Sequence, residues 1–187
     1  SFYSKLIHKK SKPLIMGILN LTPDSFYDGG KNTTITKSVK HVEKMINEGA
    51  DIIDLGAVSS RPGAHAIPLD EERKRLFPVL EKIKNHFPNI FLSVDTFRYQ
   101  IAKEAIKIGV DIINNINIKE KEENMLQIVK QNQSPYILMH IKGNPSNMQK
   151  KIHYDNFQQE ILCFFKNYIN KLNNIGINKI ILDPGFG

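Results

Sequence analysis

Six short apolar runs, each separated from the next by a longer stretch of helical periodicity, constrain the fold of this chain more than any other feature. The runs are four to six residues long and nearly continuous, at residues 14–19, 52–55, 90–94, 110–113, 136–139 and 179–182. Runs of this kind are typical of parallel strands, which are buried on both faces. The order strand, helix, strand therefore predicts an α/β fold with a parallel sheet.

The segments between the runs carry helix start and stop signals. An amphipathic stretch at residues 38–48 stops at Gly49. Asp70 is predicted to be an N-cap, and Thr96 is predicted to cap a helix that ends at Gly109. The remaining predicted helices cover residues 125–129 and 154–174.

The last of these helices is expected to pack one apolar face on the sheet. That face consists of Phe157, Ile161, Phe164, Tyr168 and Leu172. Cys163, the only cysteine, is expected to be a buried helical thiol, because its neighbours are apolar. A single cysteine excludes an internal disulfide, and no Cys/His spacing matches a structural zinc site.

Polar residues lie at the ends of the apolar runs, and they decide between two parallel folds. They are Asn20, Asp54, Asp95, Asn114, His140 and Asp183. A doubly wound sheet gathers its chemistry at one switch point, and dinucleotide binders have a glycine-rich turn after the first strand. Side chains able to bind or titrate at all six ends instead indicate the rim of a TIM (β/α)8 barrel, of which this chain carries about six β/α units.

Composition narrows the class of protein. The chain has 187 residues, of which 41% are hydrophobic and 24% charged, as in a globular domain. No apolar run approaches the roughly 18 residues of a membrane span, so a cytoplasmic protein without membrane contact is expected. The net charge of +7 admits an anionic partner, but the lysines are spread along the chain and no nucleic-acid motif accompanies them.

Two loops have sequences suited to anions and cations. The first, Asn-Leu-Thr-Pro-Asp-Ser-Phe-Tyr-Asp-Gly-Gly at residues 20–30, has the composition of a lid whose Asp24 and Asp28 can bind a hard cation. The second, Ser-Ser-Arg-Pro-Gly at residues 59–63, offers hydroxyls and a guanidinium to phosphate oxygens. Either loop alone is weak evidence, because each also reads as an ordinary turn.

Read together with four further motifs, these loops resemble those of dihydropteroate synthases. The motifs are Ser-Val-Asp-Thr at 93–96, Ile-Asn-Asn-Ile at 113–116, Leu-Met-His-Ile-Lys-Gly at 138–143 and Asp-Pro-Gly-Phe-Gly at 183–187. The resemblance implies a transferase of folate biosynthesis, a family that sulfonamides target. Its members join 7,8-dihydropterin-6-ylmethyl diphosphate to 4-aminobenzoate and release pyrophosphate.

The resemblance also implies roles for single residues. Asp95 and Asp183 would be catalytic and would bind the pterin with Asn114, while Met139 would pack on its ring. A carboxylate can accept two hydrogen bonds from the guanidine-like edge of a pterin, which makes this set chemically reasonable. Asp54 is expected to be a buried polar link and His140 a hydrogen-bonded residue rather than a general base. The alternatives are capping roles for the two aspartates and plain core packing for Met139.

The remaining implied roles fall on the first two loops. Mg²⁺ would assist the leaving group, with Asn20 beside the metal and the diphosphate and Ser60 touching phosphate oxygens. The aminobenzoate slot would be lined by Phe26, Arg61 and Pro62. Closure of the first loop would involve Asp24, Ser25 and Asp28.

Three departures from the family pattern stand out. Val58 replaces a usual Glu, and Asn115 replaces the Asp that normally follows Asn114, a loss of charge expected next to the pterin pocket. The family's Lys on the seventh strand and Arg-x-His on the eighth have no counterpart within residues 1–187. We therefore expect one incomplete pterin-binding domain, with strands 7 and 8 missing, that is inactive and poorly soluble alone. The full-length protein is expected to be a homodimer.

Two other functions are compatible with the same residues. A pterin-binding methyltransferase domain using methyltetrahydrofolate would share the pocket, although it would need neither anion-binding loop. A non-catalytic pterin-binding homologue would explain Val58 and Asn115 as decay, but not the retained Asp95, Asn114, Arg61 and Asp183.

Overall fold

The structure is a computed structural model that describes residues 12–22, 31–58, 67–115, 122–141 and 153–185. Six strands in these residues form one parallel sheet, in which each strand pairs with the next along the chain. The strands are β1 (Met16–Asn20), β2 (Ile52–Gly56), β3 (Phe91–Asp95), β4 (Ile112–Asn115), β5 (Tyr136–Met139) and β6 (Ile180–Asp183).

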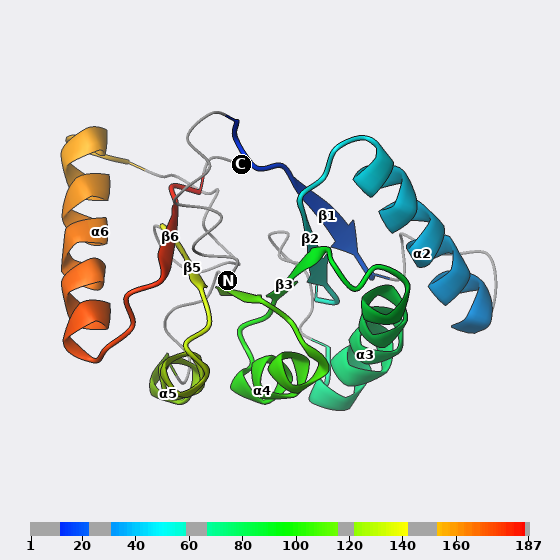
Figure 1. The fold of residues 1–187 in the computed structure, drawn as a ribbon. Coiled ribbons are helices and arrows are strands. Elements are labelled where there is room, and N and C mark those ends of the chain that lie inside the picture. Colours follow the sequence, from blue (N-terminus) through cyan, green and yellow to red (C-terminus); the bar gives the residue numbers. More distant parts are fainter. Residues whose placement is uncertain (1–11, 23–30, 59–66, 116–121, 142–152, 186–187) are drawn as a thin grey trace.

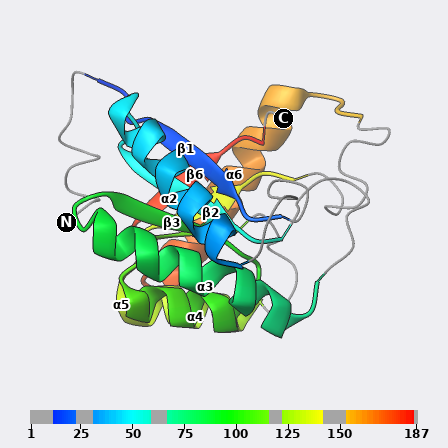
Figure 2. The same cartoon turned by 90° about the vertical axis from the view of Figure 1, so that its right-hand side faces the viewer.

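A helix connects each pair of neighbouring strands. The helices are α2 (Lys31–Asn47), α3 (Leu69–His86), α4 (Tyr99–Ile108), α5 (Glu122–Asn132) and α6 (Phe157–Asn174). They form an arc outside the strands, with α2 and α6 at its two ends (Figure 1). Viewed at right angles, α3, α4 and α5 run alongside one another (Figure 2). Sequential parallel strands with helices on one side are consecutive units of a (β/α)8 barrel, as predicted.

The two faces of the curved sheet have different chemistry. Outward side chains such as Ile53, Leu55 and Val94 are fully buried against the helices and form the main core. Inward side chains begin with an apolar layer at the amino ends of the strands, built around Ile52, Ile112 and Ile137. Polar side chains follow on the same face toward the carboxyl ends, so the interior has an apolar floor beneath a polar rim.

Gly17 shows how closely one helix approaches the sheet. A Cβ atom at Gly17 would lie 2.7 Å from the Sδ atom of Met45 on α2. The absence of a side chain on β1 therefore lets α2 pack directly on the strand.

The strand pattern of the sequence is confirmed, but most strand ends are displaced. Five of the six strands extend one or two residues further toward the carboxyl end than the apolar runs suggested, and only β5 ends where its run ends. Asn20, Asp95 and Asp183 are the last residues of β1, β3 and β6, at the strand ends where they were predicted. Asp54 lies in the middle of β2. A polar side chain can continue a parallel strand where it points into the barrel mouth.

Several helix predictions are wrong in detail. Helix α2 begins at Lys31, seven residues before the predicted start. The N-cap of α3 is Pro68, and Asp70 instead lies in the first turn, where acidic groups favour the positive end of the helix dipole. The N-cap of α4 is Arg98 rather than Thr96, whose hydroxyl accepts a hydrogen bond from the Arg98 backbone N–H at 3.1 Å.

Most of the predicted apolar face of α6 packs on the core, because Leu172 belongs to it and Ile161, Phe164 and Tyr168 lie against it. Phe165 and Leu172 are buried, whereas Phe157 is 44% exposed. Cys163 is exposed, so the prediction of a buried thiol is wrong. Its apolar neighbour Leu162 is 70% exposed, and the flanking residues were therefore a poor guide to which side of the helix faces the sheet.

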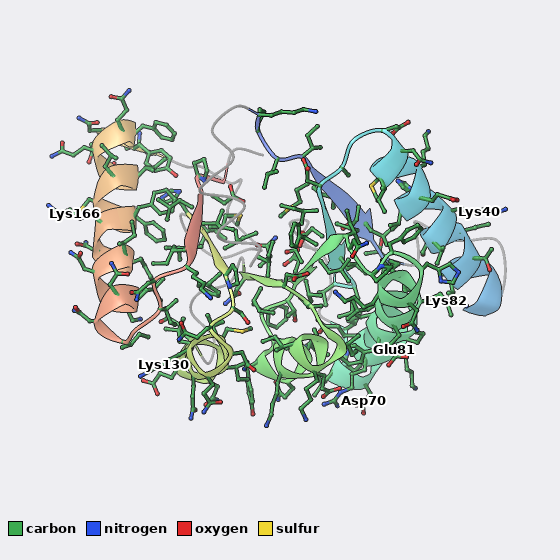
Figure 3. All side chains as sticks on the ribbon, viewed as in Figure 1. Lys40, Asp70, Glu81, Lys82, Lys130 and Lys166 are labelled. Carbon is green, nitrogen blue, oxygen red and sulfur yellow. The ribbon has the colours of Figure 1, made fainter. Side chains whose placement is uncertain are left out.

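The two outermost strands each have a partner on one side only within the described residues. Ile18 on β1 is 63% exposed and Leu182 on β6 is 43% exposed. The lysines, in contrast, are dispersed: Lys40, Lys82, Lys130 and Lys166 project from four different helices (Figure 3). None of the helices described is long and apolar enough to cross a membrane.

Candidate active site

The sheet register places three predicted site residues in one row. Asn20 pairs with Gly56, Gly56 with Asp95, and Asp95 with Asn114, each on the next strand. Paired residues of parallel strands point to the same face, so Asn20, Asp95 and Asn114 share the inward face at the carboxyl ends. Residues 75 positions apart in sequence, such as Asn20 and Asp95, are thereby brought to one rim.

Gly56 separates the first two members of this row. A Cβ atom at Gly56 would lie 3.6 Å from the Oδ2 atom of Asp95 and 3.7 Å from the Oδ1 atom of Asn20. The absence of a side chain at Gly56 thus leaves room between an amide oxygen and a carboxylate. The sequence analysis did not identify Gly56, although the Asp-Leu-Gly at residues 54–56 marked a glycine at this strand end.

Asp95 has unusual electrostatics. Burial raises the pKa of Asp95 to about 8, and the negative charges of Asp54 and Glu72 add to the effect. A carboxyl group with such a pKa exchanges its proton near neutral pH. Strongly shifted carboxyl groups at strand ends of a barrel are candidates for functional residues, which supports the predicted importance of Asp95.

Asp54 links β2 to β4, as predicted. Its side chain is 5% exposed, and its Oδ2 atom accepts a hydrogen bond of 3.1 Å from the Nδ2 atom of Asn114. Burial raises the pKa of Asp54, and the hydrogen bond from Asn114 opposes that shift. Because the amide N–H₂ of Asn114 is directed at Asp54, its Oδ1 atom remains as an acceptor, and this atom has no partner among the described residues.

Asp183 lies on the same rim, two residues beyond the row just described. It pairs with Met139, whereas Ile181 pairs with Ile137 and Ile137 with Asn114. The Oδ1 atom of Asp183 accepts a hydrogen bond of 2.8 Å from the backbone N–H of Gly185. Gly185 has φ +71°, and a Cβ there would lie 2.5 Å from the carbonyl oxygen of His140. Only glycine permits this turn, which fixes one carboxylate oxygen of Asp183.

His140 follows β5 and contacts helix α6 with its ring. The ring lies 4.9 Å from the ring of Phe164 in an edge-to-face arrangement, and Tyr154 and Phe165 are also adjacent. This position on the helix side agrees with the expectation that His140 is not a general base of the site. Met139, the preceding residue, is half-buried on the inner side beside Gly185.

Asn115 does not lie where the sequence analysis expected it. Alternation along β4 turns its side chain away from Asn114 and toward the helices. It is 1% exposed, and its Nδ2 atom donates a hydrogen bond of 3.0 Å to the hydroxyl of Tyr136. The predicted loss of charge next to the pocket is therefore wrong, because Asn115 belongs to the core between the sheet and the helices.

The predicted residues of the first two loops are not placed by the structure. Asp24, Ser25, Phe26, Asp28, Ser60, Arg61 and Pro62 lie outside the described residues. Val58 is described, and it is half-buried two residues after the end of β2. The described rim therefore contains Asn20, Asp95, Asn114, Met139 and Asp183.

The donor set of this rim can be compared with what a metal ion requires. Within the described ranges, no three His, Cys, Asp or Glu side chains gather as a metal site. Mg²⁺ is commonly held by one or two protein oxygens together with substrate phosphates and water. The amide oxygen of Asn20 and the Oδ2 atom of Asp95, which face each other across Gly56, are hard oxygen donors compatible with such a site.

Comparison with known proteins places the chain in a family. The family model described as "pterin binding enzyme" matches residues 16–187. Escherichia coli dihydropteroate synthase is 42% identical over 179 residues, covering 95% of this chain and 63% of that protein. The chain thus spans a little under two thirds of the length of this relative.

Solved structures resemble the fold closely. Yersinia pestis dihydropteroate synthase, determined with a sulfonamide drug, superposes with a TM-score of 0.84 at 39% identity, over 94% of this chain and 64% of that one. The Xanthomonas albilineans enzyme with 4-aminobenzoic acid gives 0.83 at 37% identity, over 95% and 63%. With the family model matching from β1 through β6, the chain belongs to the pterin binding enzymes.

Proposed function

We propose that the protein containing this chain is a dihydropteroate synthase. The observation that carries the proposal is the rim of Asp95, Asn114 and Asp183, which presents acceptor atoms inward from three strands. A pterin has a donor edge formed by its amino group and ring N–H, and the carboxylates and the Oδ1 atom of Asn114 complement it. The similarity to dihydropteroate synthases supports the same substrate class.

The reaction would replace the bond between the pterin methylene carbon and diphosphate oxygen with a bond to the arylamine nitrogen. An arylamine is a weak nucleophile, so we propose that diphosphate departs first with the electron pair of the broken bond. The amine then attacks the pterin-stabilised cation and loses a proton. A carboxylate fixed near the cation, such as Asp95, lowers the barrier electrostatically.

Mg²⁺ belongs to this proposal as the ion that neutralises the departing diphosphate. Asn20 would lie beside the ion and the diphosphate, and its exposed position at the end of β1 supports this role. We further propose that Ser60 contacts phosphate oxygens and that Phe26, Arg61 and Pro62 line the aminobenzoate slot, with Asp24, Ser25 and Asp28 closing the first loop. Cytoplasmic location, dimerisation and sensitivity to sulfonamides are proposed on the strength of the family.

The decisive experiment measures pyrophosphate release by the full-length protein from the pterin diphosphate, with Mg²⁺, in the presence and absence of 4-aminobenzoate. Release that requires aminobenzoate is the expected result. A folded protein that binds pteroic acid but releases no pyrophosphate would refute the proposal in favour of a binding protein. Methyl transfer from methyltetrahydrofolate would instead identify the methyltransferase.

The Asp95→Asn variant should lower kcat by about 100-fold, as expected for loss of one electrostatic contact in the transition state.

A further inference from the structure

A buried carboxylate lies behind the rim, on the helix side of the sheet. Glu72, in the first turn of α3, is 0% exposed. Its Oε1 atom accepts a hydrogen bond of 2.8 Å from the hydroxyl of Thr96, and its Oε2 atom accepts one from the guanidinium of Arg98. The sequence analysis missed Glu72 because it is one of three consecutive acidic residues at a helix start, where solvent exposure is the usual outcome.

Glu72, Thr96 and Arg98 form a cluster that fixes the turn directly after Asp95. Thr96 is the next residue, and its backbone N–H donates to the carbonyl oxygen of Asn114 at 3.0 Å. The Thr96 hydroxyl also accepts the backbone N–H of Arg98 at 3.1 Å, while the Arg98 guanidinium reaches the carbonyl oxygen of Ile67. The turn from β3 to α4 is thus attached to β4, to the first turn of α3 and to the residue that leads into α3.

A second charged pair between α3 and α4 provides a contrast. Arg73 and Glu104 join these helices through a contact of 2.6 Å, with side chains that are 33% and 38% exposed. An exposed pair contributes little to stability. Both oxygens of Glu72 are paired, but burying a charged pair costs so much solvation that apolar side chains of similar volume often stabilise a fold as well or better. A buried acid is therefore better explained by the geometry it imposes than by stability.

We propose that Glu72 is a positioning residue, which acts through Thr96 and Arg98 to fix the direction of the Asp95 carboxylate. The proposal rests on the proposed function for its kinetic consequence, because it assumes that Asp95 faces the reacting pterin. Glu72 itself touches no substrate. The effect passes through the hydroxyl of Thr96, the only group of this cluster on the residue next to Asp95.

The test compares Thr96→Val, which removes the hydroxyl, with Thr96→Ser, which keeps it, in the full-length protein. Glu104→Gln is the matched control, because it neutralises an acid between the same two helices at a distance from the rim. In Thr96→Val we expect kcat to fall about tenfold while KM for aminobenzoate changes by less than about twofold. Thr96→Ser should restore kcat, and Glu104→Gln should leave both constants unchanged.

A second readout requires no substrate. Hydrogen exchange of the Arg98 amide in the ligand-free protein should accelerate in Thr96→Val and in Glu72→Gln, but not in Thr96→Ser or Glu104→Gln. Unchanged exchange in Thr96→Val would overturn the proposal, as would equal kcat values for Thr96→Val and Thr96→Ser. If the wild-type protein releases no pyrophosphate, the proposed function fails. The exchange data then still show whether the cluster holds the turn after Asp95.

Discussion

The carboxyl group of Asp95 shows what a single side chain gains from its place in the sheet. Its neighbours include Asp54, a second carboxyl group on the adjacent strand, whose negative charge adds to the effect of burial on the pKa of Asp95. Burial and like charge both favour the protonated form, so folding binds a proton that the unfolded chain would release. The residue that best fits a catalytic role is thus also one that weakens the fold when ionised.

This arrangement predicts a pH dependence of stability. The pKa of Asp95 is raised from its ordinary value near 4 to about 8. The protonated side chain therefore contributes its full share to the free energy of unfolding below about pH 4, and this share is lost as pH rises through about 8. Asp95→Asn should therefore increase the free energy of unfolding at about pH 8.5, on the order of 2 kcal/mol, and change it little at low pH.

Urea unfolding of both proteins across this pH range measures the effect. Asp70→Asn, an exposed aspartate on α3, is the control and should keep the wild-type slope of stability against pH. Parallel curves for wild type and Asp95→Asn would show that Asp95 does not carry the proton.

The opposite directions of Asn114 and Asn115 predict different effects for changes on the two sides of β4. Tyr136→Phe removes the hydroxyl that accepts from Asn115, so it should cost about 1–2 kcal/mol of stability without weakening pteroic acid binding. Asn114→Ala should weaken binding at least about tenfold, and it also removes the hydrogen bond to the buried Asp54. Calorimetric titration and urea unfolding of both variants check this. Loss of binding in folded Tyr136→Phe would contradict the assignment of the two sides.

At the scale of whole elements, the order of strands and helices could be predicted from the sequence, whereas their ends could not. Apolar runs identify buried strands, but they cannot show that Asp95 or Asp183 continues a strand whose last side chain points into a barrel mouth. Likewise, the apolar flanks of Cys163 gave no measure of helix rotation about its axis. The candidate site residues were proposed from motifs. The contacts of Glu72 with Thr96 and Arg98 could not be, because they depend on how α3 packs beside the turn after β3.

The turn after β6 gives a prediction at this scale. In Gly185→Ala, a methyl group would meet the His140 carbonyl oxygen at 2.5 Å in a backbone conformation with positive φ, so the turn must move and release Asp183. We expect pteroic acid binding to weaken at least about tenfold.

Gly176→Ala is the matched control, because the φ of Gly176 is also positive but its nearest contact is a lysine side chain at 3.8 Å. This control should lose only about 1 kcal/mol of stability. Equal binding by both variants would refute the role of the turn.

At the scale of the molecule, the two outer strands determine how the 187-residue chain behaves in isolation. Exposed Ile18 and Leu182 lie on strands that are each paired on one side within the described part of the chain. Such edges are templates for association with other chains. We expect the isolated chain to form oligomers with increasing concentration and to release no pyrophosphate. Sedimentation velocity beside the full-length protein tests this, and a stable, active monomer of 187 residues would contradict it.

The gap over Gly56 has a consequence for the order in which ligands bind. Any group that fills it contacts the Asn20 amide on one side and the Asp95 carboxylate on the other. A ligand bound at Asn20 and a ligand bound at Asp95 would therefore be neighbours, and we expect the binding free energy of each to depend on the other. A cation near Asn20 would lower the pKa of Asp95 and so favour its ionised form. The ionised carboxylate is the better hydrogen-bond acceptor for the donor edge of a pterin. Reciprocity then requires that pterin increase the affinity for the ion by the same factor, so each ligand would bind more tightly when the other is present.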